Sequence, residues 1–238
     1  MSGTYSVDGI TWNYSTQDGV VTIGKYDNQT ARATTAGHSL GGAVIIPSTI
    51  PNSVTGTGDL VVTSIGDDAF RATAITSVTI PNSITHIGKN SFMQNSQLAS
   101  VTFGNSVGTI SQGAFYSCTS LESVTIPNSV TSLGPASFYG CTSLTSVTIP
   151  DSVASIIDGA FGATSANLVI TMNTQTINGT LYTSPTTTDI TFFGNSSVTL
   201  ILPPPPPEPT CFPAGTPIQT DQGVTAIEQL VPGEHTLR

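Results

Sequence analysis

The chain has 238 residues, only 8% of them charged, and five Lys and Arg against fourteen Asp and Glu give a net charge of −9. Soluble domains usually carry about 25% charged residues, so Ser, Thr, Asn and Gly must supply the polar surface here. No basic stripe could neutralise phosphates, which excludes nucleic acid as an expected partner. No segment approaches the ~18 apolar residues of a membrane span, so membrane insertion is not expected either.

Residues 1–43 are predicted to form an N-terminal β cap. Two short β-rich runs, Gly9-Ile10-Thr11-Trp12 and Gly19-Val20-Val21-Thr22-Ile23, flank a polar turn and predict a β-hairpin that closes an open end of the fold. Between Met1 and Tyr14 there is neither a basic nor an apolar leader, so no ordinary signal peptide is expected. A degenerate structural repeat is predicted to begin around Val44-Ile45-Ile46-Pro47.

Five phenylalanines recur at nearly constant spacing through the middle of the chain. The steps between Phe70, Phe92, Phe115, Phe138 and Phe161 are 22, 23, 23 and 23 residues. A period of this length predicts a solenoid, in which each coil packs only on its neighbours. We assign residues 44–200 to this solenoid, with degenerate terminal coils. Most of a solenoid is lateral surface, so the expected function is to hold or bind something.

Each coil follows one pattern, L-x-S-V-T-I-P-x-S-V-T-x-I-G-x-x-A-F-x-x-C-x-S, which is nearly intact from Leu121 to Ser143. The S-V-T-I segment alternates polar and apolar residues and is rich in β-branched ones, which predicts a short strand with Val and Ile inward. These strands are expected to stack into a parallel sheet on one face. The Ile and Phe of the second half are predicted to form the opposite wall of the core. A serine after the strand is predicted to hydrogen-bond the turn, at Ser83, Ser106, Ser129 and Ser152.

From about Ile65 to Ile170 the coil pattern resembles the BspA-like (Treponema-type) leucine-rich repeats. This resemblance implies a mainly-β leucine-rich-repeat solenoid of period about 23. It also implies a non-catalytic function in binding, adhesion or surface display, with a protein or glycan as partner. The expected location is extracellular or at a cell surface, and a virion surface is an alternative that would fit a chain without a signal peptide.

Two rows of hydroxyls are predicted on the outside of the stacked strands. Neighbouring strands lie ~4.8 Å apart and residues i and i+2 ~6.7 Å apart, so the rows form a regular lattice. One interpretation is that Ser and Thr simply suit exposed strand positions; another is a recognition face for a protein or glycan. A third, less favoured alternative is a face of the kind found on ice-binding solenoids. The rows, called here the strand face, are Ser77, Ser100, Ser123 and Ser146, and Thr79, Thr102, Thr125 and Thr148.

The remaining reactive residues of the solenoid are interpreted as structural. Cys118 and Cys141 are one period apart and so fall on adjacent coils, at a separation that permits a disulfide. Buried free thiols are favoured over a disulfide, because nothing indicates an oxidising compartment. His38, His86 and the Asp67-Asp68 pair lack any metal-ligand or catalytic spacing. We therefore expect no cofactor, no metal and no enzymatic site in the solenoid.

Residues 201–210 are predicted to be a polyproline linker, since five successive prolines favour a stiff rod of ~3.1 Å per residue. Residues 211–238 resemble the opening block of a Hint (hedgehog/intein) domain, through Cys211, the run Gly215-Thr216-Pro217-Ile218-Gln219-Thr220 and the run Ile227-Glu228-Gln229-Leu230. The resemblance implies that Cys211 is a nucleophile, whose thiolate attacks the preceding carbonyl and converts an amide to a thioester.

The alternative function is thus a self-processing precursor. In that case a Hint domain would cleave at Thr210-Cys211 and release or ligate the repeat module. The sequence has Glu234 where that family usually has Asp, and it lacks the later T-x-x-H block and the terminal Asn. We therefore expect a truncated Hint start, without self-cleavage in the chain as given.

Overall fold

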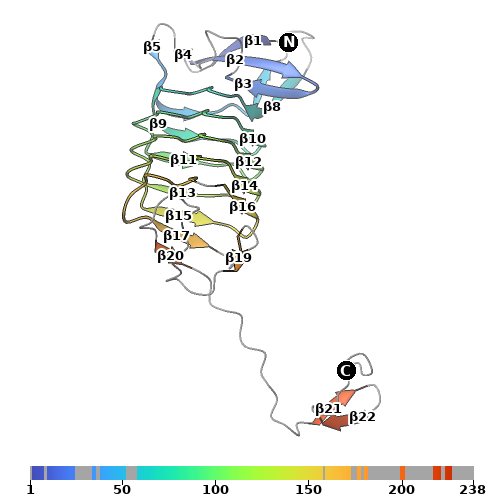
Figure 1. Ribbon diagram of the computed structural model, residues 1–238. Coiled ribbons are helices and arrows are strands. Elements are labelled where there is room, and N and C mark those ends of the chain that lie inside the picture. The colour runs from blue at the N-terminus through green and yellow to red at the C-terminus, as the bar shows by residue number, and fades with distance from the viewer. Residues whose placement is uncertain are drawn as a thin grey trace. The chain divides into compact units, whose positions relative to one another are not determined.

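The computed structural model describes residues 2–7, 10–24, 34–35, 38–51, 58–157, 159–172, 176–177, 180–181, 199–201, 217–220 and 223–226. These residues form β-strands and turns, with no helix among them (Figure 1). The chain divides into two compact units, Met1–Pro203 and Pro204–Arg238. The first unit is the mainly-β solenoid that the 22-to-23-residue period predicts.

An antiparallel meander begins the first unit. Strands β1 (Ser2–Val7), β2 (Ile10–Gln17) and β3 (Val20–Ile23) pair in chain order. The β2–β3 turn is Asp18-Gly19, and both residues have positive φ (51° and 80°), as a tight two-residue hairpin turn requires. The predicted hairpin is therefore present, with β1 as a third strand. Trp12 is buried and its ring meets that of Phe70 edge-on at 6.1 Å, which seats the hairpin on the first coil.

Strand β8 (Asp59–Ile65) connects the meander to the coils. It pairs in parallel with β3 and antiparallel with β7 (Thr49–Pro51). Two short strands, β4 (Thr34–Thr35) and β5 (His38–Ser39), extend the same sheet beyond β2. The cap and the first coil thus share one hydrogen-bonded sheet.

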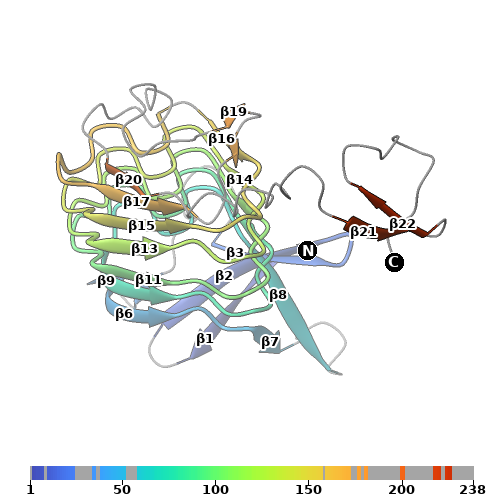
Figure 2. The same cartoon turned by 90° about the horizontal axis from the view of Figure 1, so that it is seen from below.

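The S-V-T-I segments form strands along one lateral side of the solenoid. They pair in parallel as two sheets, in the orders β11-β9-β6 and β13-β15-β17-β20, and Figures 1 and 2 show them stacked side by side. The parallel sheet is confirmed, and β6, which contains Val44, pairs in parallel with β9. In chain order the strands are β6 (Gly41–Ile45), β9 (Ala74–Thr79), β11 (Ser100–Thr102), β13 (Ser123–Thr125), β15 (Ser146–Ile149), β17 (Val169–Met172) and β20 (Thr199–Ile201).

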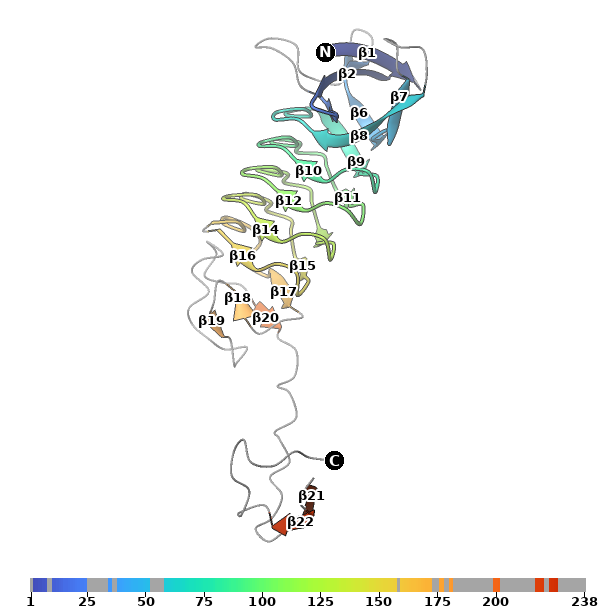
Figure 3. The same cartoon turned by 90° about the vertical axis from the view of Figure 1, so that its right-hand side faces the viewer.

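On the opposite side of the coils, the sheet of the cap continues as a narrow parallel ladder (Figure 3). Its two-residue strands are β10 (His86–Ile87), β12 (Thr109–Ile110), β14 (Ser132–Leu133) and β16 (Ser155–Ile156). They pair in register with one another and with β8. The second residue of each strand is buried, as expected for the opposite wall of the core. Two extended residues are too few to produce an alternating pattern, which is why the sequence predicts the wall but not the sheet.

The five phenylalanines form a continuous stack inside the solenoid. All five side chains are fully buried. Successive ring centroids lie 5.0, 5.1, 5.2 and 5.4 Å apart, and successive planes are inclined by 2°, 2°, 5° and 3°. Near-parallel rings at this spacing add roughly 0.5–1.5 kcal/mol per pair to the free energy of burial. The stack explains how coils with almost no charged residues cohere.

A column of buried polar side chains binds the turn that follows each phenylalanine. Asn95 donates from Nδ2 to the carbonyls of Phe70 and Phe92 (2.8 and 2.9 Å) and accepts at Oδ1 from the backbone N–H and the hydroxyl of Thr73 (2.8 and 2.6 Å). One and two coils further on, Cys118 and Cys141 donate through Sγ to Phe carbonyls at 3.2 Å. These side chains satisfy the backbone where the chain turns away from the stack.

Four serines were predicted to hydrogen-bond the turn that follows each S-V-T-I strand, and only some of them do so. Ser129 donates its hydroxyl to the carbonyl of Val107 at 2.8 Å. The hydroxyls of Ser83 and Ser152 are buried without a partner among the described residues, and Ser106 is exposed. The side chains that hydrogen-bond the turns from inside are therefore mainly those of the column of Asn95, Cys118 and Cys141.

Two other buried serines occupy the position just before the phenylalanine. Ser91 and Ser137 are fully buried, and their hydroxyls have no partner in the described part of the chain. The neighbouring coils carry Ala114 and Ala160 at the same position, also fully buried. Alanine therefore fits this site without rearrangement.

Replacing Ser137 by Ala is expected to stabilise the solenoid by roughly 1 kcal/mol, because a buried hydroxyl without a partner costs free energy on folding. Urea unfolding followed by circular dichroism measures the change. The reciprocal variant Ala114→Ser is the matched control and should lose stability. A loss of stability in Ser137→Ala would contradict this reading of the site.

The first unit ends beyond β17, and the second contains a short hairpin. In the first, β18 (Thr176–Ile177) and β19 (Thr180–Leu181) pair antiparallel. In the second, β21 (Pro217–Thr220) and β22 (Gly223–Ala226) pair antiparallel. The predicted linker lies almost wholly outside the described residues. Within the described part of the chain, no helix is long and apolar enough to cross a bilayer.

Candidate functional site

The strand face consists of two rows of hydroxyl side chains in register. In the first sheet Ser77 pairs with Ser100 and Thr79 with Thr102, and in the second Ser123 pairs with Ser146 and Thr125 with Thr148. Ser77 and Thr148 are partly buried, and the other six are exposed. The outward direction follows from the alternation of each strand, because the Val between the two hydroxyls faces the core.

The rows are interrupted between the two sheets. Strands β11 and β13 belong to different sheets, so Thr102 and Thr125 are not joined by a ladder of backbone bonds. The interruption coincides with Phe103-Gly104, which stands where other coils have Ile-Pro. The Phe103 ring turns edge-on to Phe115 at 5.7 Å, and a side chain at Gly104 would collide with the carbonyl of Pro81. The predicted lattice is therefore two registered blocks.

The structure adds residues that sequence reasoning missed at both ends of the threonine row. Thr171 pairs with Thr148 and extends the row by one coil. Beyond it, Ile201 pairs with Thr171 and is 48% exposed, and at the other end Ile45 pairs with Thr79 and is 73% exposed. Ile45 stands at the Thr position of the degenerate repeat Val44-Ile45-Ile46-Pro47, whereas the coil of Ile201 is too degenerate for the repeat pattern to place it.

The strand face offers hydroxyl donors and acceptors, methyl groups and no charge. Hydroxyls of this kind can bind a ligand by hydrogen bonds and apolar contact. Activation of a hydroxyl as a nucleophile requires an adjacent base, and none of the eight hydroxyls has one within hydrogen-bonding distance among the described contacts. No group of three or more His, Cys, Asp or Glu that could hold a metal occurs in the described part of the chain.

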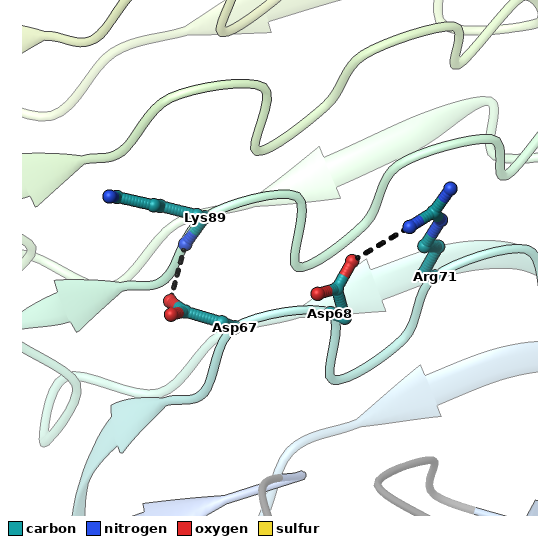
Figure 4. Close-up of polar contacts among 4 residues, drawn as sticks. All are labelled: Asp67, Asp68, Arg71 and Lys89. Atoms are coloured by element: carbon teal, nitrogen blue, oxygen red, sulfur yellow. Dashed lines mark hydrogen bonds and ion pairs between the residues drawn. The ribbon is translucent and has the colours of Figure 1, made fainter. Parts of the chain in front are cut away.

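The isolated histidines and the aspartate pair are brought into no common site. His86 is exposed in β10 and pairs with Ser64 and Thr109, and His38 lies in β5. Asp67 accepts the backbone N–H of Lys89 at 2.8 Å, and Asp68 forms an ion pair with Arg71 at 3.3 Å (Figure 4). Asp67 thereby joins two successive coils.

The two cysteines of the solenoid are free and buried. Burial raises the pKa of the Cys141 thiol from 9.0 to about 12. Burial, and then the neighbouring Cys141, raise the pKa of Cys118 well above its usual value. Both thiols therefore stay protonated near neutral pH, and a protonated thiol is a poor nucleophile and metal ligand.

Stability is expected to fall as the pH rises above 9, because the unfolded chain then loses thiol protons that the folded chain retains. The effect should grow until the pH reaches about 12, where Cys141 ionises in the folded state too. Thermal unfolding across this range measures it. The control is the double variant Cys118→Thr/Cys141→Thr, which should show a shallower alkaline decline. An equal decline in both proteins would contradict the assignment to the thiols.

A pair of stacked tyrosines on the surface was not predicted, and one predicted site residue could not be placed. The ring centroids of Tyr116 and Tyr139 lie 5.1 Å apart on the outside of adjacent turns. In the sequence, each of these tyrosines directly follows a phenylalanine of the stack. Cys211, predicted as a nucleophile, lies outside the described residues, as does Thr210.

Comparison with known proteins identifies the repeats. Residues 63–188 match six copies of the BspA type Leucine rich repeat region. Among solved structures, a leucine-rich repeat protein from Bacteroides capillosus is 30% identical over 60% of this chain and 96% of that one, with a TM-score of 0.48. The T. pallidum leucine rich repeat protein is 27% identical over 67% of this chain and 68% of that one, with a TM-score of 0.54.

A leucine rich cell surface protein from Faecalibacterium prausnitzii is 24% identical over 83% of this chain and 54% of that one, with a TM-score of 0.47. No curated protein matches the chain. The family match covers more than half of the chain and all five phenylalanines of the stack. The chain thus belongs to the BspA-type leucine-rich repeat proteins.

Proposed function

We propose that the solenoid is a non-catalytic binding or adhesion module of a cell or virion surface, and that its strand face contacts a protein or glycan ligand. The observation that carries the proposal is the pair of registered hydroxyl rows, exposed along successive coils and free of charge. A rigid, repeated array can contact an extended ligand at several points at once. Family membership supports a binding role in general.

The strand face differs from the other lateral face in a way that supports this choice. Thr85 and Thr131 on the narrow side bond the carbonyls of the preceding coil through their hydroxyls, at 3.2 and 3.4 Å. No such bond engages Thr102 or Thr125 among the described contacts. Hydroxyls without an internal partner can bond a ligand without first breaking a bond within the protein.

Binding to a panel of glycans and matrix proteins tests the proposal, with wild type compared to Thr102→Lys/Thr125→Lys. Two lysines at the centre of the strand face should weaken binding at least about tenfold, because they cover the hydroxyls and add charge to a neutral surface. The matched control is Thr131→Lys/Ala154→Lys, which adds the same charge to exposed positions of the narrow side. Equal binding by wild type and the first variant would refute the strand face as the site.

A second candidate function is self-processing by a Hint domain that begins at Cys211. The observation that supports it is the hairpin of β21 and β22, in which Pro217–Thr220 of the Hint-like segment pairs antiparallel with Gly223–Ala226. Cys211 would attack the carbonyl of Thr210 and form a thioester.

The test is to express the complete natural gene product and to follow its mass over time. Cleavage after Thr210 that disappears in Cys211→Ala would support self-processing. A product that stays intact under conditions that favour thiolate formation would exclude it, without bearing on the strand face.

A further inference from the structure

Asn-Ser dipeptides recur in this chain, and five lie in the described residues: Asn82-Ser83, Asn90-Ser91, Asn95-Ser96, Asn105-Ser106 and Asn128-Ser129. Asparagine before a small residue can lose its side-chain amide spontaneously. The backbone nitrogen of the next residue must approach the side-chain carbon Cγ, and water must then reach the product. Exposure and local freedom of both residues therefore decide which pair reacts.

Asn105-Ser106 is the one pair of the five in which both residues are exposed. Asn95 is buried and held by four hydrogen bonds, and the serine after Asn90 is fully buried. Asn82 and Asn128 are exposed, but the serines that follow them are partly buried. The side-chain oxygen of Asn82 is also held by the backbone N–H of Asn105 at 2.8 Å.

The turn around Asn105 differs from its three equivalents in its first residue. The equivalent turns begin with Pro81, Pro127 and Pro150, whereas this one begins with Gly104. Proline fixes one backbone angle and glycine leaves it free, so this turn has the more flexible backbone. The strand of the next coil, β13, does not pair with β11, the strand that precedes Asn105.

We propose that Asn105 is a spontaneous deamidation site. The nitrogen of Ser106 forms a bond to Cγ of Asn105, the bond from Cγ to Nδ2 breaks, and ammonia leaves with the proton of the Ser106 N–H. Water then opens the cyclic imide to aspartate or isoaspartate. No charged side chain lies between Lys89 and Glu122. The new carboxylate therefore adds a negative charge to a neutral part of the surface, three residues after Thr102. The fourth coil already carries Asp151 at this position, so the turn accommodates a carboxylate.

Peptide mapping by mass spectrometry tests the proposal on the folded chain, incubated at mildly alkaline pH and sampled over time. Asn105 should lose its amide several-fold faster than Asn82 and Asn128, and Asn90 and Asn95 should stay intact. In urea the five sites should react at similar rates, which shows that the fold sets the ranking. Equal rates at Asn105 and Asn128 in the folded chain would overturn the proposal.

Two variants at the exposed neighbour test the chemical step. Ser106→Gly should accelerate the loss at Asn105, because the smaller residue frees the attacking nitrogen, and Ser106→Val should slow it several-fold. Circular dichroism confirms that both variants stay folded. If neither substitution changes the rate at Asn105, attack by the Ser106 nitrogen is refuted.

Discussion

Replacing Phe115 by Ala is expected to cost about 3–5 kcal/mol of unfolding free energy. Phe115 is fully buried at the centre of the stack, where its ring lies 5.1 Å from that of Phe92 and 5.2 Å from that of Phe138. The variant removes both stacked contacts and leaves a cavity that rigid neighbouring coils cannot close. Because each coil is stabilised only by its neighbours, the loss should also separate the unfolding of the two halves.

Urea unfolding monitored by circular dichroism and by tyrosine fluorescence measures this effect. Two probes that no longer report one transition would indicate that the halves have separated. The matched control is Phe103→Ile, because Phe103 meets Phe115 only edge-on and other coils have Ile at its position. That variant should cost less than about 1.5 kcal/mol. A loss in Phe115→Ala no greater than in the control would refute the central role of the stack.

The features predictable from the sequence are those that recur in every coil. The S-V-T-I segment has four residues of strict alternation, so its strand and its inward Val could be assigned. The two-residue strand at Thr109–Ile110 has no such pattern, and only the structure shows that it pairs with its neighbours.

The features that could not be predicted occur where one coil departs from the others. The ladder between β11 and β13 is absent at the coil where Phe103-Gly104 replaces Ile-Pro, and Gly104 lies tightly against Pro81; the repeat pattern expresses neither feature. Asn95 was not predicted to bond the turn. It stands where the next two coils have cysteine, and one asparagine in a cysteine position cannot be told from ordinary sequence variation between repeats. The strand face was predictable for the opposite reason, since its Ser and Thr follow the repeat.

Replacing Asn95 by Ala is expected to cost roughly 3 kcal/mol, because it leaves the buried N–H of Thr73 without a partner and removes one of the two side-chain donors of the Phe70 and Phe92 carbonyls. The amide of Asn95 holds the carbonyls of two successive phenylalanines and the N–H of Thr73, all within the buried turn. Alanine removes every one of these bonds and adds none, so the carbonyl of Phe70 loses its hydrogen bond from Nδ2. Urea unfolding measures the difference in free energy.

The matched control is Asn95→Cys, since cysteine occupies the same position in the next two coils and donates there to a phenylalanine carbonyl at 3.2 Å. Cysteine restores the bond to a phenylalanine carbonyl and an acceptor for the N–H of Thr73, since Cys118 and Cys141 accept the backbone N–H of Asn95 and Cys118 in the same way. Its cost should therefore fall between wild type and Asn95→Ala. Amide hydrogen exchange adds a local readout: the N–H of Thr73 should exchange faster in Asn95→Ala, because its acceptor is the side-chain oxygen of Asn95. Unchanged exchange at Thr73 in Asn95→Ala would show that the turn is held by packing alone, and the polar column would then have no structural role at that coil.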